Sequence, residues 1–109
     1  MLVVMKDIIP YLPDSEKYDL KDQLSRSCKA IPRLIAEGYG KRHQIAGFQK
    51  YLDDALGESN ETIVSLEQCR DIYKINPCLI EKLADIYDKT SRQLYNLGQA
   101  WSNFKNAKQ

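Results

Sequence analysis

The amino-acid sequence predicts an all-α protein, an antiparallel up-down four-helix bundle with a short first helix and a proline-kinked second helix. Three long segments carry apolar residues at alternating spacings of three and four, which places those residues on one face of a helix. Short turns separate the segments, as is typical of antiparallel helix neighbours. No stretch alternates with the two-residue period of a strand. With 109 residues, positions 1–109 are expected to form a single domain.

The first predicted helix is short and the second is long. Residues 2 to about 12 read LVVMKDIIPYL, an apolar segment that Pro10 and Pro13 interrupt. The second helix is expected from about residue 16 to residue 39. Its core stripe follows helical spacing: Leu20, Leu24, Cys28, Ile31 and Ile35.

A proline lies inside the second helix. Pro32 has no N–H to bond the carbonyl of Cys28, and its ring clashes with that carbonyl, at a usual cost of ~3 kcal/mol. A sequence that keeps proline among core residues is expected to use the resulting kink. Glycines at positions 38 and 40 then end the helix, because glycine readily adopts the conformation that follows a helix C-terminus.

The third and fourth helices are predicted from uninterrupted stripes. The third is expected from about residue 44 to residue 75, with the stripe Ile45, Phe48, Leu52, Ala55, Ser59, Thr62, Leu66, Cys69 and Tyr73. Asn76 and Pro77 are typical of a helix start, since asparagine caps free N–H groups and proline fits the first helical position. The fourth helix has the stripe Ile80, Leu83, Tyr87, Thr90, Leu94, Leu97, Trp101 and Phe104.

Two blocks of the sequence carry a family resemblance. Residues 30–42 read AIPRLIAEGYGKR, and residues 55–61 read ALGESNE. Their order and spacing resemble the four-helix-bundle proteins encoded in 23S ribosomal-RNA intervening sequences. Those proteins are similar to the accessory variability determinant proteins that partner reverse transcriptases in diversity-generating retroelements. The resemblance covers about residues 11–104. The family usually has an Arg-Arg pair ahead of Ser-Ile-Pro; here Ser25 and Arg26 occupy the positions of the pair, and Ala30 replaces the serine.

Charge is unevenly distributed along the chain, although the net charge is only +1. Residues 17–50 hold eight Lys or Arg and three Asp or Glu, a net +5, whereas residues 53–71 hold six acids and one arginine, a net −5. Clustered cations neutralise nucleic-acid phosphates. The candidate nucleic-acid-binding residues, which we call the basic surface, are Arg26, Lys29, Arg33, Lys41, Arg42 and Lys50.

Two other interpretations of the basic surface remain open. Asp22–Arg26 and Arg33–Glu37 are i, i+4 pairs that stabilise a helix by roughly a few tenths of a kcal/mol each. Alternatively, the positive surface of one subunit docks on the negative surface of the next, as in a ring with head-to-tail contacts. No aromatic residues are interleaved with the stripe of Arg26, Lys29 and Arg33, so any nucleic-acid binding is expected to be backbone-led and weakly sequence-specific.

A second candidate set is polar. Glu37 closes the proline-containing helix, and Asn60 and Glu61 follow the small residues of the third helix. Buried carboxylates need partners, which Arg26 or Arg33 could supply. These residues are interpreted either as a network that joins helices or subunits, or as ordinary surface polarity.

Other chemistry is not indicated. The chain has one histidine, His43, and no Cys-x-x-Cys pair, so we expect no metal site and no cofactor. Cys28 and Cys69 lie on apolar stripes and are interpreted as core residues. No nucleotide-binding fingerprint occurs, and no catalytic residue is predicted. No apolar run approaches the ~20 residues of a membrane span, so a cytoplasmic location without membrane contact is expected.

The leading functional hypothesis is a non-catalytic, oligomeric accessory protein that binds RNA or DNA. The resemblance implies a homopentameric ring, and two settings: ribosomal RNA or a reverse-transcriptase partner. The sequence itself argues only for self-association, because the short first helix leaves apolar surface uncovered. The alternative is a structural homo-oligomerisation module with no nucleic-acid role.

Overall fold

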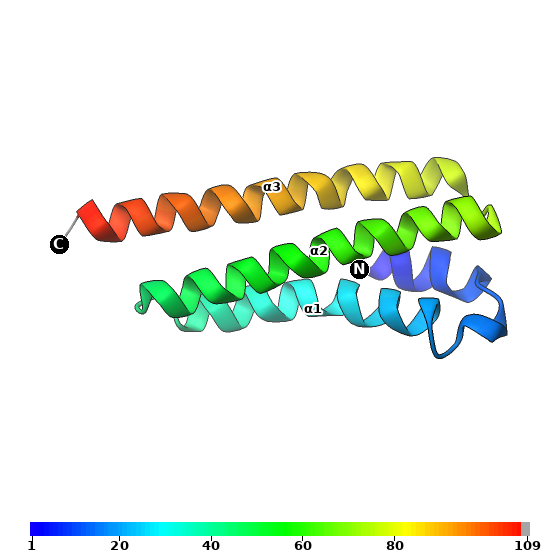
Figure 1. The fold of residues 1–109 in the computed structure, drawn as a ribbon, viewed down its shortest axis with the longest axis horizontal. Coiled ribbons are helices and arrows are strands. Elements are labelled where there is room, and N and C mark those ends of the chain that lie inside the picture. Colours follow the sequence, from blue (N-terminus) through cyan, green and yellow to red (C-terminus); the bar gives the residue numbers. More distant parts are fainter. Residues whose placement is uncertain (108–109) are drawn as a thin grey trace.

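The computed structural model describes residues 1–107, and that range is helical without strands. The three long helices are α1 (Leu20–Gly40), α2 (Ile45–Tyr73) and α3 (Pro77–Ala107). They lie along the longest axis of a molecule of 53 × 24 × 17 Å, with α2 packed against both α1 and α3 (Figure 1). In Figure 1 the chain runs from right to left in α1, back in α2, and from right to left again in α3.

The all-α prediction with four helical segments is confirmed. Of the predicted domain, residues 108 and 109 lie outside the described range. Within residues 1–107, no helix combines the length and apolarity that a membrane crossing requires.

The first helical segment is short and irregular. A π-helical turn, η1 (Val4–Ile8), continues into a 3₁₀ turn, η2 (Ile9–Tyr11), and the chain is extended at Leu12. Val4, Ile8 and Leu12 are buried against the long helices. Pro10 and Pro13 account for the break, because neither can donate the N–H that a continuing helix needs.

The second helix begins later than the sequence predicts. Residues Asp14–Glu16 form a separate 3₁₀ turn (η3), and α1 starts at Leu20. The Glu16 carboxylate accepts hydrogen bonds from the Leu20 N–H, at 3.1 Å, and from the Tyr73 hydroxyl. Glu16 therefore lies before α1, and its side chain caps the first N–H group of the helix. Beyond this start, α1 runs through Pro32 to Gly40.

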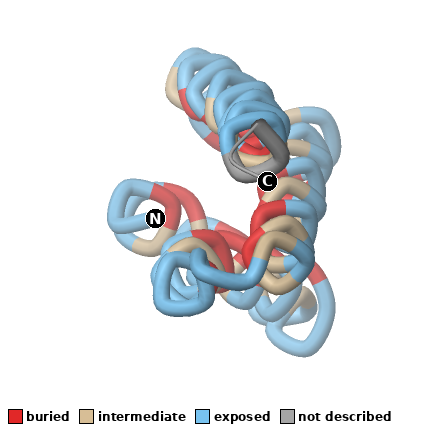
Figure 2. Tube along the Cα trace, turned by 90° about the vertical axis from the view of Figure 1, so that its left-hand side faces the viewer, coloured by how far each residue is buried: buried red, intermediate tan, exposed pale blue. Residues whose placement is uncertain are grey.

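The core lies along the inner faces of the helices, and the buried residues of Figure 2 follow it. The predicted stripes of α1 and α2 are largely confirmed: Ile35, Ile45 and Tyr73 are half-buried, and the other stripe residues are buried. On α3 the stripe is confirmed at Leu94 but wrong at Leu97 and Phe104, which are 43% and 50% exposed. The buried positions there are Ser91, Leu94 and Gly98. A straight helix repeats every 3.6 residues, so its buried face drifts from a strict heptad.

Four buried hydroxyl groups form two hydrogen-bonded pairs, Ser27 with Thr62 and Ser59 with Ser91, and we call them the hydroxyl layer. Thr62 Oγ1 donates to Ser27 Oγ at 2.9 Å, which joins α2 to α1. Ser91 Oγ lies 2.8 Å from Ser59 Oγ, and Ser59 donates to the Tyr87 carbonyl at 2.9 Å, which joins α2 to α3. The small residues of α2 thus allow close approach of α3, and their polar atoms are paired.

The turn between α2 and α3 is built on specific backbone bonds. Lys74 adopts the left-handed conformation (φ 54°), and the buried Ile75 donates its N–H to the Cys69 carbonyl at 3.3 Å. This arrangement closes a helix C-terminus, although glycine is the usual residue there. The predicted helix start is confirmed, since the Asn76 side chain accepts from the Leu79 N–H at 3.4 Å and α3 begins at Pro77.

Two glycines are expected to respond oppositely to alanine. A Cβ at Gly38 would lie 2.7 Å from the Tyr51 Cβ, so we expect Gly38→Ala to destabilise the protein by about 1–3 kcal/mol. A Cβ at Gly57 meets no atom within 4 Å, and Gly57→Ala is expected to stabilise by roughly 0.5–1 kcal/mol. Urea unfolding followed by circular dichroism measures both, and equal effects would contradict the close approach of α1 and α2 at Gly38.

Candidate nucleic-acid interface

The structure brings three of the predicted cations together. Arg26, Lys29 and Arg33 of α1 line one surface hollow of about 350 Å³, together with Ala30 and with Glu58 of α2. The side chains of Arg26 and Arg33 are 71% and 61% exposed. Arg26, Lys29 and Arg33 together form a positive edge on α1.

Two ion pairs accompany this positive edge. Arg26 Nε lies 2.9 Å from Asp22 Oδ2, and Arg33 Nη1 lies 3.6 Å from Glu37 Oε1. Exposed pairs of this kind contribute about 0–1 kcal/mol and are weakened by salt. The guanidinium groups can therefore exchange these carboxylates for phosphates at little cost.

The other predicted cations lie towards the turn between α1 and α2. Lys41 and Arg42 follow α1, and Lys50 is exposed near the start of α2. The Arg42 guanidinium stacks 4.1 Å from the centre of the Tyr39 ring and donates to the Tyr39 carbonyl at 2.9 Å. Lys41 is eight residues beyond Arg33, roughly 12 Å along a helix axis. The basic surface therefore has two parts, and only the first shares a hollow.

Glu58 belongs to the site but was missed by the sequence analysis. It lies beside the cations of α1, and burial followed by the charge and hydrogen bond of Glu61 raises the pKa of Glu58. Arg26 and Arg33 act on this pKa in the opposite direction. The available signal was the i, i+3 spacing of Glu58 and Glu61, which sets two like charges side by side.

Glu58 is expected to make stability depend on pH. A raised pKa in the folded protein means that ionisation of Glu58 opposes folding, so stability falls as the pH rises through this pKa. We expect Glu58→Gln to raise the melting temperature at about pH 7, and the advantage to shrink below about pH 4, where glutamate is protonated in both states. Calorimetry across this range tests the prediction, with the exposed Glu67→Gln as control. A Glu58→Gln advantage independent of pH would contradict it.

The three residues of the proposed polar network lie in different surroundings. Glu37 is in its exposed pair with Arg33. Asn60 Oδ1 accepts from the Ser91 hydroxyl at 2.9 Å, so Asn60 connects α2 to α3. Glu61 is exposed and lines a hollow with Arg26 and Asn60. The structure thus brings Asn60 and Glu61 into one hollow and places Glu37 in the ion pair on α1.

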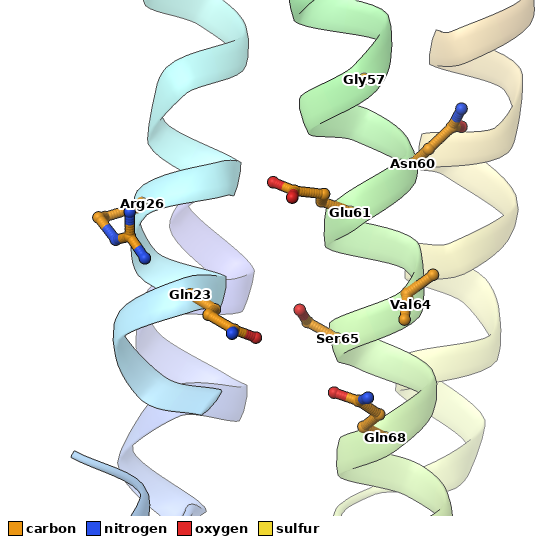
Figure 3. A pocket seen from close by; sticks show the side chains of 8 residues that line it. All are labelled: Gln23, Arg26, Gly57, Asn60, Glu61, Val64, Ser65 and Gln68. Atoms are coloured by element: carbon orange, nitrogen blue, oxygen red, sulfur yellow. The ribbon is translucent and has the colours of Figure 1, made fainter. Parts of the chain in front are cut away.

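This second hollow, which we call the amide groove, lies between α1 and α2 and has a volume of about 400 Å³. In Figure 3, Gln23 from α1 faces Ser65 and Gln68 from α2, and the Glu61 side chain also points towards α1, whereas the Arg26 side chain lies on the side of α1 turned away from α2. Its full lining is Gln23, Arg26, Gly57, Asn60, Glu61, Val64, Ser65 and Gln68. The glutamines carried no signal in the sequence, because single polar residues on a helix resemble ordinary solvated positions.

An apolar hollow of about 540 Å³ lies where the first helical segment begins. Its lining comes from the N-terminal segment, α1 and α3, and includes Leu2, Pro32 and Ile86. Leu2 and Ile86 are 63% and 55% exposed. The sequence predicted uncovered apolar surface on the third and fourth helices, and this hollow includes residues of α3 but none of α2.

The cysteines differ in their surroundings. Cys28 and Cys69 are buried, as predicted, and Cys78 is exposed. Burial raises the pKa of Cys69 to about 11 and also raises the pKa of Cys28. Both buried thiols therefore stay protonated at neutral pH, and a protonated thiol is a poor nucleophile.

Comparison with known proteins gives one result. The family described as "23S rRNA-intervening sequence protein" matches residues 2–96. No curated protein and no solved structure matches the chain.

Proposed function

The chain belongs to the 23S rRNA-intervening sequence protein family, and from this membership we propose that it is a non-catalytic accessory protein that binds the backbone of RNA or DNA. The observation that carries the proposal is the exposed cluster of Arg26, Lys29 and Arg33 around one hollow. Cations held together in this way replace the counterions of neighbouring phosphates, which favours binding without reading the sequence.

We also propose that the protein acts as a homo-oligomer, in the form of a ring of five subunits. The uncovered apolar hollow beside Pro32 supports self-association, since exposed apolar surface of this kind favours association. We further propose an antiparallel up-down arrangement of the helices, a kink at Pro32 and a cytoplasmic location. The setting is either ribosomal RNA or a reverse transcriptase of a diversity-generating retroelement, and the neighbouring genes distinguish these two.

Charge reversal tests nucleic-acid binding. The triple variant Arg26→Glu, Lys29→Glu and Arg33→Glu is expected to lose more than about tenfold in affinity for a labelled RNA of mixed sequence, measured by fluorescence anisotropy. The control reverses three exposed cations of α3, Lys82, Lys89 and Arg92, and so changes the net charge equally. Equal losses in both variants would mean that only net charge matters, and the proposed interface would be rejected.

The second candidate is a structural homo-oligomerisation module with no nucleic-acid role. The apolar hollow favours this candidate, because it offers a surface for a neighbouring subunit. Light scattering of the same triple variant separates the candidates. An intact oligomer with lost RNA affinity supports nucleic-acid binding, whereas a dissociated oligomer supports subunit docking through the basic surface.

A further inference from the structure

We propose that the amide groove is a pocket for one unpaired nucleobase that carries an amino group, and this inference rests on the proposed nucleic-acid binding. Arg26 lines both the amide groove and the hollow that holds Lys29 and Arg33. A strand whose phosphates lie on these cations therefore passes directly beside the groove. A nucleotide there can turn its base into the groove while its phosphate stays on α1.

The walls of the groove carry the groups that read base edges. Gln23 and Gln68 each offer an amide donor and an amide acceptor, and Ser65 adds a hydroxyl group. Amide side chains pair with adenine and carboxylates accept from the amino group of cytosine in specific nucleic-acid complexes. The volume of about 400 Å³ falls within the range of small-ligand sites. Gly57 keeps part of the wall open, since a Cβ there meets no atom within 4 Å.

The charges of the groove determine which part of a nucleotide enters it. The α1 wall holds the cation Arg26, whereas the α2 wall holds Glu61 with Glu58 nearby. Carboxylates repel phosphate but accept hydrogen bonds from the amino groups of bases. The phosphate is therefore directed towards α1 and the amino edge of the base towards α2.

This polarity identifies the class of ligand. Adenine, guanine and cytosine have an exocyclic amino group, and uracil has none. The base must be unpaired, because pairing occupies the edge that Glu61 would contact, and unpaired bases are the usual targets of sequence-specific RNA recognition. The backbone-led binding expected from the sequence thus gains a preference against uracil at one position.

Homopolymeric RNA decamers of adenine, cytosine and uracil provide the test. We expect the adenine and cytosine decamers to bind more than about fivefold more tightly than the uracil decamer, since one good base contact discriminates by ~1–3 kcal/mol. The double variant Gln23→Ala, Gln68→Ala and the filling variant Gly57→Leu should both reduce this preference to near unity. The slope of affinity against salt should stay unchanged, because no phosphate contact is removed.

The matched control replaces two exposed glutamines of α3, Gln93 and Gln99, by alanine. This control should keep the preference, and circular dichroism should show all variants folded. Equal binding of the three decamers by the unaltered protein, or equal effects of the two double variants, overturns the base pocket while backbone binding stands. Absence of salt-dependent binding to every decamer overturns both proposals.

Discussion

Replacing Ile80 with alanine is expected to lower the free energy of unfolding by about 2–5 kcal/mol. Ile80 is fully buried in the larger core cluster, where it lies with Leu24 and Leu66. The lost contacts and the cavity left behind both destabilise the folded chain. For a domain of this size the melting temperature should fall by roughly 10 °C or more.

The same substitution at an exposed isoleucine gives the control. Ile72 on α2 is 63% exposed, so Ile72→Ala is expected to change stability by less than about 0.5 kcal/mol. Thermal unfolding by circular dichroism at fixed protein concentration measures both variants. Similar losses at the two positions would show that Ile72 is covered by another molecule, or that the core around Ile80 is loosely packed.

Affinity for single-stranded RNA is expected to fall steeply with salt. If Arg26, Lys29 and Arg33 each neutralise one phosphate, raising the salt from about 50 mM to about 200 mM should weaken binding about 20-fold. If Lys41, Arg42 and Lys50 also contribute, the loss should be roughly 300-fold. The slope of log affinity against log salt concentration therefore gives the number of cations of the basic surface that contact the strand.

Charge reversal on α1 provides the internal comparison for this slope. The triple variant at Arg26, Lys29 and Arg33 should show a flatter dependence on salt, whereas reversal of the α3 cations should leave the slope unchanged. A slope near zero for the unaltered protein would contradict binding led by phosphates. Because the basic surface has two parts, a slope between these two values would show that only some of the cations near the turn contact the strand in addition to the cations of α1.

The helices could be predicted from the sequence because apolar spacing reflects which face of a helix is buried. Leu20, Leu24 and Cys28 on α1 follow this rule closely. The rule fails on α3, where the real helical repeat buries Gly98 in place of Leu97. The start of α1 was also placed too early, since the Glu16 carboxylate accepts from the Leu20 N–H and also from Tyr73, a residue distant in sequence.

The site was less predictable than the fold. The grouping of Arg26, Lys29 and Arg33 follows from spacing within one helix. Glu58 and Gln68, both on α2, join them only because α1 packs against α2 in a particular alignment. Spacing along a single helix contains no information about that alignment.

The hydroxyl layer determines which alignment of the helices is allowed. Apolar stripes repeat along each helix, so a pair of helices displaced by seven residues still sets apolar side chains against each other. Such a displacement would bring Ser91 opposite Leu52 or Leu66 in place of Ser59. The buried hydroxyl group left without a partner would lower the free energy of unfolding by ~1–3 kcal/mol. The paired hydroxyl groups thus disfavour the shifted pairings that the hydrophobic pattern alone would tolerate.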